Sequence, residues 1–213
     1  MTLVCLEFGK RRVFASALQW PGWCRSGRSE HDALEALATY ADRYAEVVDV
    51  AGLSRPDPAA DFVVVERLTG DMTTDFGAPA AIATWEREPL AGAEAQRLAG
   101  LLRSSWTVLD GVVDVTPAEL RKGPRGGGRD RDAMVDHILG AEVAYGRKVG
   151  VRQRQRAHDD PGGIAALRED LVGAVLAGDT QPAPAWPPRY AVRRIAWHAL
   201  DHAWEMQDRT HPA

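Results

Sequence analysis

Two histidines of this sequence have the spacing of a metal-binding pair. His198 and His202 lie four residues apart in the run Arg194–Glu205. On a helix, residues with this spacing project from nearly the same face, so both imidazoles can point at one atom. Imidazole is the commonest protein ligand for zinc, nickel, copper and iron. If a third imidazole joined them, the site would keep open positions for chemistry, unlike a closed structural site.

His137 is the candidate third ligand, and it lies on a different predicted helix. At about 100° per residue it shares a face with Met134 and Tyr145, which we expect to point into a helical bundle. Glu142 projects roughly 140° away from His137 by the same periodicity and is a poor partner for it. The alternative is that His137 is an ordinary hydrogen-bonded interior residue.

The histidine pair lies at one edge of the apolar stripe of its helix. Glu205 and Arg194 lie beside His198 and His202 on that edge. An edge of this kind predicts a mouth between helices with polar groups at its rim, where bundles place ligand and metal sites. A bare HxxxH pattern is short, however, and satisfied boundary histidines give the same spacing.

The second half of the chain must supply the helices that position these side chains. Apolar residues at helical spacing predict four helices. Asp160 and Pro161 form a typical start for the third, with an acidic cap and proline in the first turn. The other three are expected over about 91–112, 130–149 and 189–209.

The first half reads as a small α+β unit of order β-β-α-β. Gly9-Lys10 is a candidate two-residue hairpin turn, and Ser29 is a candidate cap for a helix that continues to about Val50. The expected strands are 2–8, 11–18 and 62–68, and 73–80 is expected to be a loop. We therefore predict an α+β domain over 1–87 and an all-α, up-down four-helix bundle over 88–213.

Composition narrows the classes of function. The chain has 213 residues and a formal net charge of −4, which argues against a generic nucleic-acid binder. It has two cysteines, Cys5 in a predicted strand and Cys24 after a turn where it could be accessible. Sparse cysteine and the lack of a leader-like or bilayer-spanning apolar run predict a cytoplasmic protein without a membrane partner. The sequence leaves both a monomer and a homodimer possible.

The second half resembles the DinB-like (YfiT-like) four-helix-bundle superfamily. The resemblance rests on Asp136-His137-Ile138-Leu139 and on the run from Arg193 to Glu205, and it covers roughly 90–209. It implies that His137, His198 and His202 bind one divalent metal, most simply zinc or nickel. Members similar to this bundle include transferases and isomerases that work with low-molecular-weight thiols, so the resemblance also implies a thiol cofactor.

The first half is similar to a HicB-like domain, the small ribonuclease-H-like fold of some antitoxins. Val13–Leu18, Pro21-Gly22 and the segment Ser29–Ala38 carry this weaker likeness. The segment Trp20–Cys24 is more aromatic than such domains usually are, and no helix-turn-helix candidate accompanies it. Likeness of fold alone does not transfer antitoxin function.

A basic, glycine-rich loop at 121–131 precedes His137 by about two helical turns. Its arginines can hold a carboxylate or phosphate, so Arg125 and Arg129, with Arg194, are candidate substrate-binding residues. Glu205 is the candidate catalytic residue, as a proton carrier or as a group that orients a ligand. A solvated loop without a ligand is the alternative for 121–131.

Two functions follow from these residues. The first is a metal-dependent transferase, isomerase or hydrolase that acts with a small thiol or an acidic small molecule. The second is a non-catalytic binding or regulatory module, in which a HicB-like surface makes the interaction and the metal is structural or lost. The spacing of the histidines does not decide between them.

Overall fold

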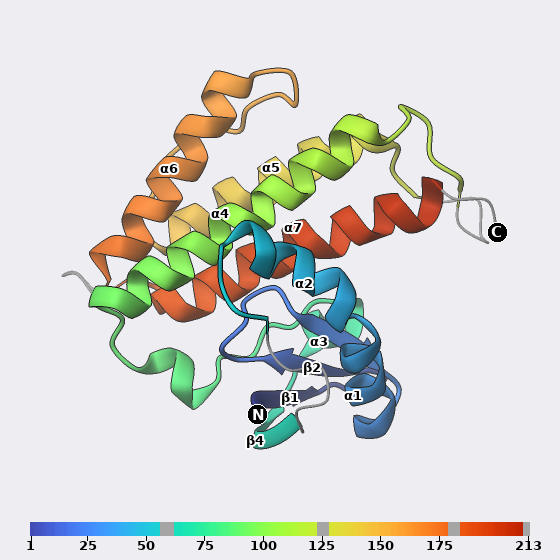
Figure 1. The fold of residues 1–213 in the computed structure, drawn as a ribbon, viewed down its shortest axis with the longest axis vertical. Helices are drawn as coiled ribbons and strands as arrows, with labels where there is room; N and C mark the ends of the chain where they lie inside the picture. Colours follow the sequence, from blue (N-terminus) through green and yellow to red (C-terminus); the bar gives the residue numbers. More distant parts are fainter. Residues whose placement is uncertain (56–61, 123–127, 179–183, 211–213) are drawn as a thin grey trace.

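A computed structural model describes residues 1–55, 62–122, 128–178 and 184–210. The chain forms a small four-stranded mixed sheet followed by helices, so it is an α+β protein. In Figure 1 the long helices α4–α7 lie above the sheet, and α2 lies between the sheet and α4.

The sheet has the strand order β3-β2-β1-β4. β1 (Thr2–Phe8) pairs antiparallel with β2 (Val13–Ala17), and β2 pairs antiparallel with β3 (Cys24–Gly27). β4 (Phe62–Thr69) runs parallel to β1. The prediction of β-β-α-β was therefore wrong, because it lacked β3, which is only four residues long and directly follows the turn at Trp20–Trp23.

The hairpin between β1 and β2 is also longer than predicted. Residues 9–12 form a four-residue connection closed by Gly9 N–H donating to the Arg12 carbonyl at 2.8 Å. The pattern of glycine followed by lysine suggested a tighter turn, but strand pairing ends at Phe8 and Val13. Asp75 accepts a hydrogen bond from the Arg11 N–H and holds the longer loop.

The single helix expected to follow Ser29 is two helices, α1 (Glu30–Thr39) and α2 (Ala41–Val50). Ser29 caps α1 as predicted, since its side chain accepts from the Asp32 N–H. The chain breaks at Tyr40, whose ring contacts Trp204 at 5.0 Å between centroids. Helical spacing continues from Leu37 through Tyr44, so periodicity alone did not show the break.

The expected loop at 73–80 contains a short helix, α3 (Met72–Phe76). Asp71 caps it by accepting hydrogen bonds from the Thr73 and Thr74 N–H groups, and the Thr74 hydroxyl accepts from the Asp71 N–H. A 3₁₀ turn, η1 (Thr84–Arg87), then leads toward the long helices.

Four long helices make up the second half, close to their predicted bounds. They are α4 (Gly92–Val115), α5 (Arg131–Lys148), α6 (Pro161–Ala177) and α7 (Pro188–Thr210). The predicted cap of α6 is present, because the Asp160 carboxylate accepts from the Gly163 N–H at 2.9 Å. α4 packs against α7 and α6, and α5 packs against α7 and α6.

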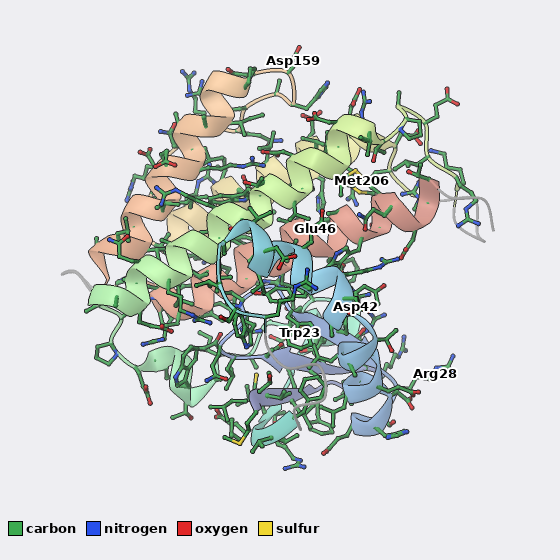
Figure 2. The ribbon with its side chains drawn as sticks, viewed as in Figure 1. Trp23, Arg28, Asp42, Glu46, Asp159 and Met206 are labelled. Atoms are coloured by element: carbon green, nitrogen blue, oxygen red, sulfur yellow. The ribbon has the colours of Figure 1, made fainter. Side chains whose placement is uncertain are left out.

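One hydrophobic core runs through the two halves of the chain. Residues of the sheet, of α2 and of α4–α7 belong to the same buried cluster. Trp23, 2% exposed and stacked on Tyr44, lies in its lower part, and Met206 of α7 lies in its upper part (Figure 2). Among the described residues, no helix has both the length and the apolar character needed to cross a bilayer.

The contact between the halves explains two residues that the sequence left open. Trp197 packs edge-on against Phe14 in a small cluster that includes Cys24. Cys24 is fully buried, so the expectation that it is accessible was wrong. Burial raises the pKa of both Cys24 and Cys5 to about 12, which leaves neither thiol suited to act as a nucleophile.

Candidate metal centre

Two helices bring the three predicted histidines together. His137 lies on α5, and His198 and His202 lie one turn apart on α7. The two helices pack against each other, so the i, i+4 pair on α7 faces the single histidine on α5. One nitrogen from each of the three rings can be chosen so that all three lie within 4.8 Å of one another.

The ring geometry is that of a convergent set. His137 Nε2 and His198 Nε2 are 3.2 Å apart. The ring centroids are 5.0 Å apart for His137 and His198, 5.1 Å for His137 and His202, and 4.7 Å for the α7 pair. Two nitrogens bound to one tetrahedral ion at about 2.0–2.1 Å are separated by roughly 3.3–3.4 Å. The closest pair therefore has a spacing that suits shared ligation.

His198 is the most buried of the three, with 8% of its surface exposed. Its Nδ1 is buried without a hydrogen-bond partner among the described residues, and its Nε2 meets only His137. A hydrogen-bonded core histidine would satisfy these nitrogens with protein groups. An ion held between the Nε2 atoms of His137 and His198 would give His198 Nε2 a partner besides the other imidazole, so the Nε2 atoms fit a bound ion, while Nδ1 keeps no protein partner among the described residues.

Burial also favours the protonation state that a metal needs. Desolvation, followed by the charge of His202, lowers the pKa of His137. The same two effects, together with His137, hold the pKa of His198 well below its ordinary value. Both rings are therefore neutral at physiological pH, with a lone pair free to bind a cation.

Glu205 lies next to His202. Its Oε2 is 3.0 Å from His202 Nδ1, and its Oε1 accepts a hydrogen bond from Arg209 at 2.9 Å. The hydrogen bond with His202 is the main cause that lowers the pKa of Glu205, so it is a carboxylate. A carboxylate on Nδ1 fixes the tautomer in which His202 Nε2 is free to bind a metal.

Two aromatic rings and one buried arginine lie beside His198. The Tyr145 ring is 5.9 Å from the His198 ring, and the Trp197 ring is 6.0 Å from it. The Arg194 guanidinium lies 5.4 Å from the centre of the Tyr145 ring and 4.7 Å from that of Trp197. Arg194 also donates to the Pro79 carbonyl at 3.2 Å, which fixes its position.

The three predicted substrate-binding arginines have different surroundings. Arg194 is 7% exposed and is held by Pro79 and two rings, so it is part of the wall of the site. Arg129 is exposed, and its charge contributes to lowering the pKa of His137 and His198. Arg125 lies outside the described residues.

Sequence reasoning missed two residues of this site. Arg209 follows Glu205 by four residues, a spacing at which opposite charges meet on a helix, and that signal was available. For Tyr145 the sequence predicted a core position on the same helix face as His137. It did not predict the contact of Tyr145 with His198, because the periodicity of one helix does not show which residues of α7 lie next to it. Glu142 was rightly excluded: its Oε1 accepts from Trp106 Nε1 at 2.7 Å, away from the histidines.

The chain was compared with known proteins, and no protein-family model, curated protein or solved structure matches it.

Proposed function

We propose that His137, His198 and His202 bind one divalent metal ion and that this centre serves an enzyme. The observation that carries the proposal is the convergence of three imidazoles from two helices, with the Nε2 atoms of His137 and His198 3.2 Å apart. Three protein ligands leave positions open on a four- to six-coordinate ion, as catalytic sites do. The DinB-like resemblance of the second half supports the same assignment.

The donor set favours zinc or nickel. Three neutral imidazoles suit borderline metals and do not suit the all-oxygen sites of magnesium or calcium. When bound, such an ion acts as a Lewis acid and lowers the pKa of a coordinated water or thiol. This chemistry fits a transferase, isomerase or hydrolase that acts with a small thiol or an acidic small molecule.

The surrounding residues would each have one task. Glu205 orients His202 through Nδ1 and, since Arg209 holds its other oxygen, it acts on the ligand ring rather than on substrate. Arg129 offers an exposed positive charge near the histidines for an acidic substrate. Tyr145 and Arg194 border His198 and restrict the shape of the space beside it.

The first experiment is metal analysis of the full-length protein. We expect about one zinc or nickel ion per chain by elemental analysis after loading and desalting. His137→Ala and His202→Ala should each lose the metal, while the matched variant His31→Ala, which removes an exposed histidine of α1, should retain it. Circular dichroism of each variant shows whether loss of metal reflects loss of fold. A folded wild-type protein that retains no stoichiometric metal would refute the centre.

The second experiment tests catalysis separately. The metal-loaded protein is assayed for turnover of thiol-dependent transfer and of ester substrates, with His202→Ala and chelator-treated protein as controls. Turnover that depends on both metal and His202 supports the enzyme. Stoichiometric metal without any such turnover would instead indicate the non-catalytic module, in which the metal stiffens the contact between α5 and α7.

A further inference from the structure

The segment that follows α5 has no helix or strand over 151–157, and it is held to both α5 and α6. Val151 N–H donates to the Gly146 carbonyl at 2.8 Å, just before the end of α5. Gln153 Nε2 donates to Asp170 of α6 at 2.6 Å, and Gln155 Nε2 donates to the Asp136 carbonyl of α5 at 2.9 Å. These three contacts, one from the backbone and two from side chains, hold the segment 151–155 to the helices.

This segment presents arginines to solvent. Gln153 and Gln155 are held to the helices by their hydrogen bonds. Arg152 and Arg154 are exposed. Together with Arg147, from the last turn of α5, and with Gln153, they line a hollow of about 430 Å³.

These three arginines have no carboxylate partner among the described residues. Nearby arginines do have one: Arg103 pairs with Glu169 and Arg168 with Asp110, at 2.8 and 2.7 Å. The C-terminal end of α5 accounts for a basic residue at position 147, but not for two more in the segment that follows. Three unpaired guanidinium groups around one hollow, in a chain of net charge −4, form a concentrated positive field.

We propose that this hollow is an anion site for a ligand with two adjacent phosphate groups. Guanidinium forks match phosphate oxygens in pairs of parallel hydrogen bonds. Three positive charges exceed those that a single phosphate, at about −1.5 to −2, would neutralise. The volume falls within the range of roughly 300–1,000 Å³ typical of small-molecule sites.

The site is separate from the metal centre, since no histidine lines it. It also differs from a nucleic-acid track, because it is a single hollow in an acidic chain and not a stripe of cations. A free diphosphate compound and a phosphorylated lipid headgroup offer the same chemistry to it. The test below includes both sources.

Calorimetric titration of the full-length protein with inorganic pyrophosphate tests the site directly. We expect saturable binding of one pyrophosphate per chain, and weaker binding of orthophosphate. Arg152→Gln/Arg154→Gln should bind pyrophosphate about tenfold to a hundredfold more weakly, since charged hydrogen bonds are lost. Arg28→Gln/Arg87→Gln is the matched control: it removes the same charge from two exposed arginines elsewhere and should bind like wild type. Figure 2 shows Arg28 on the side of the molecule away from α6.

Because pyrophosphate can also contact a bound metal, the titration is repeated with His202→Ala. Retained binding in that variant supports a separate site, and its loss there would assign the binding to the metal centre and overturn the proposal. Phosphatidylcholine vesicles with and without phosphatidylinositol bisphosphate are tested by co-sedimentation: capture that requires both the phosphorylated lipid and Arg152/Arg154 identifies the lipid source. No saturable pyrophosphate or lipid binding, an equal loss in the control, or tighter multi-site binding of single-stranded RNA would each refute the proposal.

Discussion

Replacing Glu142 with glutamine should make the protein more stable at neutral and alkaline pH. Glu142 lies on α5 with 1% of its surface exposed, and its Oε2 is buried without a hydrogen bond among the described residues. The guanidinium of Arg168 is nearby, but its Nε is 3.9 Å away and its NH1 bonds to Asp110. Burial outweighs this cation and raises the pKa of Glu142 from 4.5 to about 7.

The size of the effect follows from the two pKa values. Because folding raises the pKa of this carboxyl, the folded protein favours its neutral form. The contribution of Glu142 to the unfolding free energy is therefore fully present below about pH 4.5 and is lost as the pH rises through about 7. A difference of about 2.5 pKa units at 1.36 kcal/mol per unit corresponds to about 3 kcal/mol. Glutamine keeps the acceptor for Trp106 and does not ionise, so it avoids this loss.

The assay is urea unfolding of wild type and Glu142→Gln between about pH 4 and pH 9. The difference in unfolding free energy should be small at the acid end and should grow to about 3 kcal/mol above pH 7. Subtracting the two curves removes the titration of all other groups, including the histidines. Glu119→Gln, at an exposed position, is the control and should give a flat difference. A flat difference for Glu142→Gln as well would refute the reasoning.

Three further predictions concern contacts around α7. Arg193→Met leaves the Glu86 carboxylate buried without its 2.5 Å partner and should lower the unfolding free energy by about 3–5 kcal/mol in urea melts. Adding Glu86→Leu should restore part of this loss, because it removes the buried charge but also the acceptor of the Ala83 N–H. Glu205→Gln should weaken metal binding about 10- to 100-fold by competition with a chelator dye, with the far-UV circular dichroism unchanged. Gly22→Ala, at a φ of +95° with the new Cβ 2.6 Å from Leu200 Cδ1, should cost about 1–3 kcal/mol in thermal melts, and an unchanged melting temperature would contradict the packing.

Local signals in the sequence predicted the long helices well. Asp160 followed by Pro161 marked the start of α6, and repeating apolar positions marked α4, α5 and α7 within a few residues. The break at Tyr40 was not predictable in this way, because helical spacing of apolar residues continues across it, and the ring of Tyr40 contacts Trp204, far away in the sequence. The short strand β3 was missed for a similar reason: only its pairing with β2 defines it as a strand.

In the candidate site, too, contacts within one helix were predictable from the sequence and contacts between elements were not. The i, i+4 spacing of His198 and His202 and the i, i+3 spacing of Glu205 are properties of one helix, and each gave the right neighbour. The approach of His137 required the packing of α5 on α7, which periodicity within one helix could not show; His137 was proposed from its place on the core face of its helix and from the resemblance of the second half. For Cys24 the local signal was misleading: its position after a turn predicted an accessible thiol, but in the fold Trp197 packs against it.

The N-terminal sheet and α7 together explain why the histidines can hold their positions. Adjacent side chains of a helix point in directions about 100° apart, so the packing of Trp197 determines the direction in which His198 points. Trp197 packs in one small cluster with Phe14 and Cys24, and one turn earlier Arg193 is paired with Glu86. Rotation of α7 about its axis would break both contacts at once. The first half of the chain therefore acts as a support that fixes the orientation of α7, and with it the direction in which two of the three candidate ligands point.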